Sequence, residues 1–154
     1  MSITNYIVLF NMLIAVDFDG TIVENKYPEI GRELPFAVET MKMLQAERHR
    51  LVLWSCRQGQ LLQDALDWCR ERGLEFYAVN NDYPEETFEN NPYYTRKIKA
   101  DLFIDDRNVG GLPDWGVIYQ MVAKKMSWRE IVNANETLDN SDRSHRPWWQ
   151  FWKG

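Results

Sequence analysis

An apolar run that ends in two aspartates is the feature that most constrains this chain. The run Leu13–Asp17 ends in the sequence Asp-Phe-Asp-Gly-Thr, which puts carboxylates at Asp17 and Asp19. A short apolar run that stops at a turn signal is typical of a strand covered on both faces. Two carboxylates this close repel each other unless something positive lies between them. The sequence therefore predicts a buried strand whose end needs a cation.

Strand-like and helix-like segments alternate along the chain. Apolar residues recur at helical spacing over Pro35–Arg48 and over Gln58–Arg72. The remaining predicted elements are strands at Leu51–Ser55, Glu75–Asn80, Asp101–Asp106 and Gly116–Gln120, and a last helix over Trp128–Asn135 that begins at a capping box of Ser127 with Glu130. This alternation indicates an α/β fold with three layers, a Rossmann-like parallel sheet flanked by helices.

Length and charge limit the organisation and the partners. The 154 residues suggest one domain, which we assign to residues 12–135 between an N-terminal extension (1–11) and a polar linker with a Trp-rich tail (136–154). The net charge of −5 counts against generic nucleic-acid binding. The N-terminus has no basic region or cleavage site, so we expect a cytoplasmic protein.

The Trp-rich tail suggests an interaction. Three of the seven tryptophans fall in the last seven residues, after a polar stretch. Exposed apolar patches usually mark contact surfaces. The tail is expected to dock on its own domain, to bind a partner or a second subunit, or to rest at a membrane interface, and the sequence leaves these alternatives open.

Polar side chains follow the predicted strands at the point where each strand ends. They are Asp17 and Asp19, Ser55, Asn80, and Asp105 with Asp106. Because ligands bind beyond the carboxyl ends of parallel strands, we expect these side chains to converge on one edge of the sheet. Four carboxylates there need a cation, and hard oxygen ligands favour Mg²⁺. An aspartate held ionised beside such a metal can act as a nucleophile in phosphoryl transfer.

The same residues carry a family resemblance. The run VDFDGTIVE resembles the first motif of the haloacid dehalogenase (HAD) superfamily of phosphohydrolases. The other three motifs follow in order: the serine of LVLWSCR, a lysine of RKIKAD and the acidic pair of LFIDDRN. The wider sequence is similar to a group of small members of that superfamily that lack a cap domain. The resemblance implies an HAD-type fold and a Mg²⁺-dependent phosphatase that cleaves phosphomonoesters.

The resemblance also implies a role for each motif residue. Asp17 would be the nucleophile and a metal ligand. Asp19 would offer its backbone carbonyl to the metal, protonate the leaving oxygen and then activate water. Ser55 would bind a phosphoryl oxygen, and Asp105 and Asp106 would complete the Mg²⁺ site directly or through water.

The catalytic lysine has two candidates. Relatives place the lysine four residues before the fourth strand, which favours Lys97, and Lys99 is the alternative. This lysine would offset the negative charge of the nucleophile and of the phosphoryl group.

No cap domain is expected over this site. The stretch from Gly20 to Pro35 leaves room for only a short flap, so closure falls to Glu24–Glu33, to Asp82–Tyr94 or to a neighbouring subunit of an oligomer. Such an open site suits a phosphorylated small molecule or a phosphorylated macromolecule. The residues expected to contact the substrate are Thr21, Tyr27, Arg57 and Asn80.

Two other functions compete with the phosphatase hypothesis. One is a non-catalytic phosphate-binding or scaffolding domain that keeps the fold, although the intact Asp19 counts against it. The other is a two-component receiver domain, which also combines Asp, Mg²⁺, Ser or Thr, and Lys. Receivers place the phosphorylated aspartate after the third strand, where this chain has Asn80.

Overall fold

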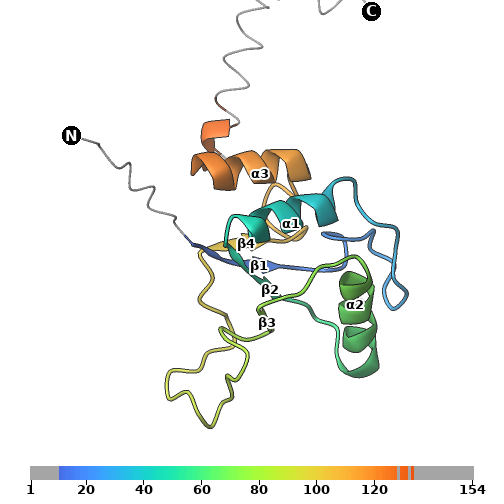
Figure 1. Cartoon of the computed structure of the whole chain (residues 1–154), viewed down its shortest axis with the longest axis vertical. Coiled ribbons are helices and arrows are strands. Elements are labelled where there is room, and N and C mark those ends of the chain that lie inside the picture. The colour runs from blue at the N-terminus through green and yellow to red at the C-terminus, as the bar shows by residue number, and fades with distance from the viewer. Residues whose placement is uncertain (1–10, 128, 132, 134–154) are drawn as a thin grey trace, which may run out of the picture. The chain divides into compact units, whose positions relative to one another are not determined.

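A four-stranded parallel sheet forms the centre of the fold (Figure 1). Its strands are β1 (Leu13–Val16), β2 (Arg50–Leu53), β3 (Ala78–Val79) and β4 (Leu102–Ile104), in the order β3-β2-β1-β4. The computed structural model describes residues 11–127, 129–131 and 133. The chain divides into two compact units after Trp115, and the whole sheet belongs to the first.

The central position of β1 explains its sequence. In the parallel register, Ile14 lies opposite Leu51 of β2 and Leu102 of β4, so β1 has a neighbour on both sides. All four residues of β1 are buried, as the uninterrupted apolar run predicts. The strand then delivers Asp17 to the carboxyl edge, where its backbone N–H donates to the Ile104 carbonyl at 3.0 Å.

Two helices connect the first three strands. Helix α1 (Ala37–Ala46) buries Val38, Met41 and Leu44 at helical spacing and contacts β2. Helix α2 (Gly59–Glu71) follows β2, and its Trp68 packs edge-on against Phe18 with the ring centroids 5.7 Å apart. These elements confirm the predicted α/β fold with a parallel sheet flanked by helices, the Rossmann-like three-layer class.

One face of the sheet is closed largely by small and branched side chains. Its buried cluster consists of Leu13, Ala15, Val52, Ala78 and Ile98, with Trp54, Tyr77, Ala100 and Phe103 packed against it. Between β3 and β4 the chain forms a long loop without helix or strand, which extends away from the sheet (Figure 1). No inserted domain therefore interrupts the described sheet, as predicted.

The expected strand at Gly116–Gln120 is wrong, because this segment lies within helix α3 (Trp115–Lys124). Trp115, Ile118 and Val122 are buried and recur at intervals of three and four residues, which is the helical period. The five-residue window was too short to distinguish a strand from part of an amphipathic helix. The other predicted strands were too long by one to four residues, since their ends bend into the loops that carry polar side chains.

The C-terminal part of the described chain begins as predicted. The Ser127 hydroxyl and backbone N–H donate to Glu130 Oε2 at 2.7 and 2.6 Å, and the Glu130 N–H donates back to the hydroxyl. This is the expected capping box, and residues 129–131 and 133 are helical. The tail (136–154) and residues 1–10 of the N-terminal extension lie outside the described residues. No helix in the described part of the chain is long and apolar enough to cross a membrane.

Candidate active site

Three carboxylates meet where β1 and β4 end. The side chains of Asp17, Asp105 and Asp106 each offer an oxygen, and these oxygens all lie within 4.8 Å of one another. Asp17 comes directly after β1 and the acidic pair directly after β4, which is paired with β1. The parallel pairing therefore brings together the side chains of three of the four residues that we expected to share a metal.

Thr21 links Asp17, which follows β1, to Asp106, which follows β4. Its hydroxyl accepts a hydrogen bond from the Asp106 backbone N–H at 3.0 Å and donates to Asp17 Oδ2 at 3.4 Å. Its carbonyl accepts from Trp115 Nε1 at 3.0 Å, and the residue is fully buried. We expected Thr21 to contact substrate, but the structure places it beneath the carboxylates, where it fixes their spacing.

Asp106 has an oxygen without a hydrogen-bond partner. Its Oδ1 is buried and meets no donor among the described residues. Burial and the neighbouring Asp105 carboxylate raise the pKa of Asp106, and the guanidinium of Arg107 lowers it. A buried carboxylate oxygen without a donor is costly unless a cation or an ordered water satisfies it. This oxygen therefore suits a metal ligand.

Burial acts strongly on Asp17 as well. The pKa of the Asp17 carboxyl is raised from 3.8 to about 7, mainly because the group is buried. A backbone hydrogen bond at Phe18 acts in the opposite direction and lowers this pKa. The carboxylates of Asp105, Asp106 and Asp19 raise it further. Without a cation, this carboxyl therefore takes up a proton more readily than an ordinary aspartate does. A cation among the three carboxylates would keep this carboxylate ionised.

Gly20 lies so close to Asp106 that a side chain does not fit between them. A Cβ at Gly20 would overlap Asp106 Oδ2, and the glycine has a φ of +85°. We expect Gly20→Ala to lower the free energy of unfolding by roughly 1–3 kcal/mol and to weaken metal binding. The control is Gly111→Ala, where φ is +79° and nothing lies within 4 Å of the new methyl group. Equal metal affinity in the two variants, measured by calorimetry, would contradict this explanation.

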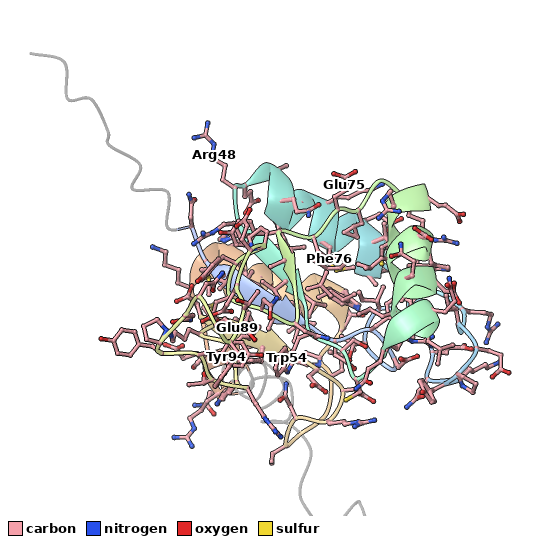
Figure 2. The ribbon with its side chains drawn as sticks, turned by 90° about the horizontal axis from the view of Figure 1, so that it is seen from below. Arg48, Trp54, Glu75, Phe76, Glu89 and Tyr94 are labelled. Atoms are coloured by element: carbon pink, nitrogen blue, oxygen red, sulfur yellow. The ribbon has the colours of Figure 1, made fainter. Side chains whose placement is uncertain are left out.

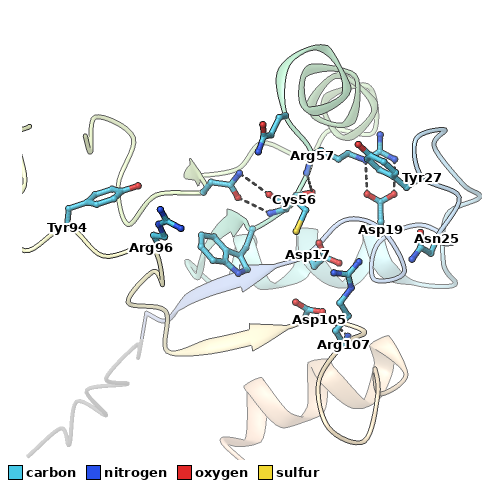
Figure 3. A pocket seen from close by; sticks show the side chains of 14 residues that line it. Asp17, Asp19, Asn25, Tyr27, Cys56, Arg57, Tyr94, Arg96, Asp105 and Arg107 are labelled. Atoms are coloured by element: carbon cyan, nitrogen blue, oxygen red, sulfur yellow. Dashed lines mark hydrogen bonds and ion pairs between the residues drawn. The ribbon is translucent and has the colours of Figure 1, made fainter. Parts of the chain in front are cut away.

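Asp19 points away from the cluster and pairs with Arg57. Figure 3 shows its carboxylate directed toward the guanidinium, which donates to both carboxylate oxygens at 2.7 Å. The side chains are only 1% and 13% exposed, for Arg57 and Asp19 respectively. Hydrogen bonding to Asp19 raises the pKa of Arg57, so the guanidinium stays charged. The resemblance implies that Asp19 would bind a metal through its backbone carbonyl. That carbonyl takes no part in the ion pair with Arg57.

Ser55 and Asn80 lie at the ends of the next two strands. The Asn80 side-chain amide spans the Ser55 backbone: its Oδ1 accepts from the Ser55 N–H at 2.8 Å, and its Nδ2 donates to the Ser55 carbonyl at 3.0 Å. The Ser55 hydroxyl accepts from the Arg57 N–H at 3.2 Å. Asn80 thus holds the loop that presents the serine, a positioning role that the sequence prediction did not include.

A cavity of about 680 Å³ opens above these groups. This volume is typical of small-molecule sites. It is lined by Asp17, Asp19, Asn25, Tyr27, Trp54, Ser55, Cys56, Arg57, Gln58, Asn80, Tyr94, Arg96, Asp105 and Arg107. Tyr27 and Tyr94 come from the two segments that we expected to border the site.

The structure does not bring either candidate lysine to this cavity. Lys97 is exposed, with its Nζ 5.3 Å from the centre of the Phe103 ring. Lys99 pairs with Asp82, its Nζ 3.7 Å from the carboxylate. The positive charges that line the cavity are Arg57, Arg96 and Arg107.

Sequence reasoning missed Arg96, Arg107 and Trp54 among the lining residues. Trp54 and Arg107 each adjoin a predicted strand-end residue, Ser55 and Asp106, so their position along the chain was a usable signal. Arg96 comes from an irregular loop, where no periodicity indicates which of RKIK faces inward.

Comparison with known proteins supports the fold. The chain resembles a solved structure of a conserved protein from Bacteroides thetaiotaomicron at 64% sequence identity and a TM-score of 0.74. The match covers 79% of this chain and 97% of that one. The chain therefore belongs to the same family as that conserved bacterial protein. No protein-family profile matches the chain, and no curated protein does.

Proposed function

We propose that this protein is a Mg²⁺-dependent phosphohydrolase that cleaves a phosphomonoester through an aspartyl-phosphate on Asp17. The observation that carries the proposal is the meeting of Asp17, Asp105 and Asp106, of which Asp17 and Asp105 line a cavity. The Asp19–Arg57 pair lines the same cavity, and the order of the four motifs along the chain agrees with the HAD superfamily.

The residues present fit a magnesium ion. Asp17, Asp105 and Asp106 offer only hard oxygen ligands, and Oδ1 of Asp106 has no other partner among the described residues. These three side chains would hold the ion, together with the Asp19 carbonyl that the resemblance adds. When bound, Mg²⁺ supplies the positive charge that keeps Asp17 ionised and offsets the charge on phosphoryl oxygens.

The chain's own residues account for the two steps of hydrolysis. A carboxylate oxygen of Asp17 attacks phosphorus, the bond from phosphorus to the leaving oxygen breaks, and Asp19 gives that oxygen a proton. Water then attacks phosphorus and gives a proton back to Asp19. The bond from Asp17 to phosphorus breaks, which releases phosphate and restores the carboxylate. The Ser55 hydroxyl would donate to a phosphoryl oxygen during both steps.

The leaving group would lie against the outer walls of the cavity. Those walls combine the aromatic rings of Tyr27, Trp54 and Tyr94 with the guanidinium of Arg96. Rings of this kind offer flat apolar surfaces, so an aryl phosphate is a suitable first substrate to assay. The test compares hydrolysis of such an ester with Mg²⁺ and with a chelator. Turnover that does not depend on a divalent metal would contradict the proposal.

Metal binding should also be visible without turnover. We expect Mg²⁺ to raise the melting temperature of the wild type, because a ligand that binds only the folded state stabilises it. Asp105→Asn and Asp106→Asn should each lose most of this increase. The control is Glu75→Gln, which removes a charge from an exposed position far from Trp54 in Figure 2. An equal increase in all four proteins, measured by scanning fluorimetry, would mean that the ion binds elsewhere.

Arg107 is better placed than Lys97 to offset phosphoryl charge. Arg107 lines the cavity, and its guanidinium lowers the pKa of Asp106, whereas Lys97 lies over Phe103. We expect Arg107→Gln to reduce kcat/KM by ~10–100-fold and Lys97→Gln to reduce it less than ~3-fold. Steady-state kinetics of the two variants decides between the residues. The opposite ranking would restore the lysine that the resemblance implies.

A non-catalytic phosphate-binding domain is the alternative to this enzyme. It would bind beryllofluoride with Mg²⁺, as an aspartyl-phosphate mimic, yet hydrolyse nothing in a broad panel of phosphorylated metabolites. The same panel would identify the substrate class if the protein is an enzyme.

A further inference from the structure

The segment from Glu24 to Glu33 forms one wall of the cavity. It is pinned at its base by two backbone hydrogen bonds, from the Glu24 N–H to the Arg32 carbonyl at 2.7 Å and from the Leu34 N–H to the Ile22 carbonyl at 2.9 Å. Asn25 and Tyr27 of this segment line the cavity. The position of this wall segment (residues 24–33) therefore controls how open the site is.

A single buried side chain joins the wall segment to the proposed acid. Arg57 Nη1 donates to the Pro28 carbonyl at 3.0 Å, and Nη2 donates to the Glu29 carbonyl at 2.9 Å. The same guanidinium holds both oxygens of Asp19 at 2.7 Å. Its central carbon lies 5.2 Å from the centre of the Phe18 ring and 5.4 Å from that of Tyr27.

These contacts involve all three guanidinium nitrogens. Its donors are divided between a carboxylate of the first motif and two carbonyls of the wall segment, and the side chain is 1% exposed. A planar fork with fixed donor directions cannot shift toward one partner without misaligning the bonds to the other. Loss of either partner would also leave buried polar groups unpaired. The two sets of contacts should therefore form and break together.

We propose that Arg57 is a positioning residue that couples the wall segment to the Asp19 side chain as one two-state element. With the contacts made, the wall is closed down on Arg57, and the Asp19 carboxylate points away from the Asp17 cluster. When the wall lifts, the guanidinium loses its carbonyl partners, and Asp19 is released to reach a leaving oxygen above Asp17. Opening of the cavity and release of the acid are then one event. The part that concerns the acid rests on the proposed function, but the mechanical coupling does not.

Hydrogen exchange at the base of the wall segment tests the coupling without any substrate. We expect Arg57→Gln and Asp19→Asn each to speed exchange of the Glu24 and Leu34 amides by ~10-fold or more. The double variant should exchange no faster than the faster single variant, because either change already breaks the shared element. Arg70→Gln, an exposed arginine on α2, is the control and should change nothing.

Asp19→Asn is the decisive variant in this experiment. A purely catalytic Asp19 would leave exchange in the wall segment at the wild-type rate, and that result would overturn the proposal. Additive effects in the double variant would also overturn it. The amide of Trp54, bonded to the Val16 carbonyl at 2.8 Å, reports on the sheet and shows whether each variant is still folded. If Arg57→Gln fails this check, Asp19→Asn and Arg57→Lys decide the result.

An activity measurement separates this proposal from the proposed function. Arg57→Lys keeps the positive charge but loses the planar guanidinium that binds several partners at once. It should therefore lower kcat by ~10-fold with KM changed less than ~3-fold. A rise in KM alone would show that Arg57 only binds substrate and would contradict the coupling to Asp19. If the wild type hydrolyses no phosphomonoester, the proposed function fails, while the exchange result still decides on the coupling.

Discussion

Asp17→Asn is expected to reduce turnover by ~10³-fold or more and, at the same time, to stabilise the metal-free protein. An amide cannot attack phosphorus as the carboxylate does, which removes the first step. The stabilisation arises because Asp17 is buried among the Asp105, Asp106 and Asp19 carboxylates. Removing its charge relieves both its desolvation and this repulsion.

The pH dependence of stability gives this prediction its control. The pKa of Asp17 is raised from 3.8 to about 7, so the folded protein holds this proton more tightly than the unfolded chain. The contribution of Asp17 to stability is therefore complete below the lower value and is lost as pH rises through the higher one. With a chelator present, Asp17→Asn should remove this loss and melt above the wild type at about pH 8. A lower melting temperature there would mean that the variant is inactive because it is damaged.

Arg57→Ala should be among the most destabilising single changes in the chain. It leaves the Asp19 carboxylate buried without its partner, and removing one member of a buried pair costs about 3–5 kcal/mol. For a chain of this size, that corresponds to a fall of ~10 °C in melting temperature. Chemical denaturation monitored by tryptophan fluorescence measures the loss.

Two further variants identify the cause of that loss. The double replacement Arg57→Met with Asp19→Leu removes both charges and should recover the part of the stability that the unpaired carboxylate costs, because apolar side chains of similar size can replace a buried ion pair. The Pro28 and Glu29 carbonyls lack their donor in both variants. Arg32→Gln removes an exposed arginine that contacts Glu24 at 2.6 Å, and it should cost no more than about 1 kcal/mol. A double variant as unstable as Arg57→Ala would show that packing and the two carbonyl contacts, and not the unpaired carboxylate, dominate the loss.

The part of the site that follows from strand topology could be predicted from the sequence. Asp17, Asp105 and Asp106 meet because parallel strands present their carboxyl ends to one edge, whatever the details of the loops. Helix α2 was predicted to within one residue at each end, since its apolar spacing and Gly73 mark both its course and its end. The spacing of apolar residues and the residues that form turns are local features, so they predict helix bounds from the sequence alone.

The rest depends on side-chain directions that no local pattern encodes. Asp19 and Arg57 lie far apart in sequence, and they can pair because each follows one of two neighbouring strands, β1 and β2. In the irregular loop before β4, Arg96 lines the cavity while Lys97 does not. The helix at Trp115–Lys124 was missed because a short apolar window fits a strand equally well.

The most direct test of the central claim is to trap the phosphorylated protein. Wild type and Asp19→Asn would be mixed with Mg²⁺ and an aryl phosphate, quenched in acid, digested and analysed by mass spectrometry. We expect one phosphoryl group on the peptide that contains Asp17, in larger amount in the Asp19→Asn protein, because that variant lacks the group that activates water. Metal-dependent release of phosphate with no phosphoryl group on Asp17 in either protein would contradict the mechanism.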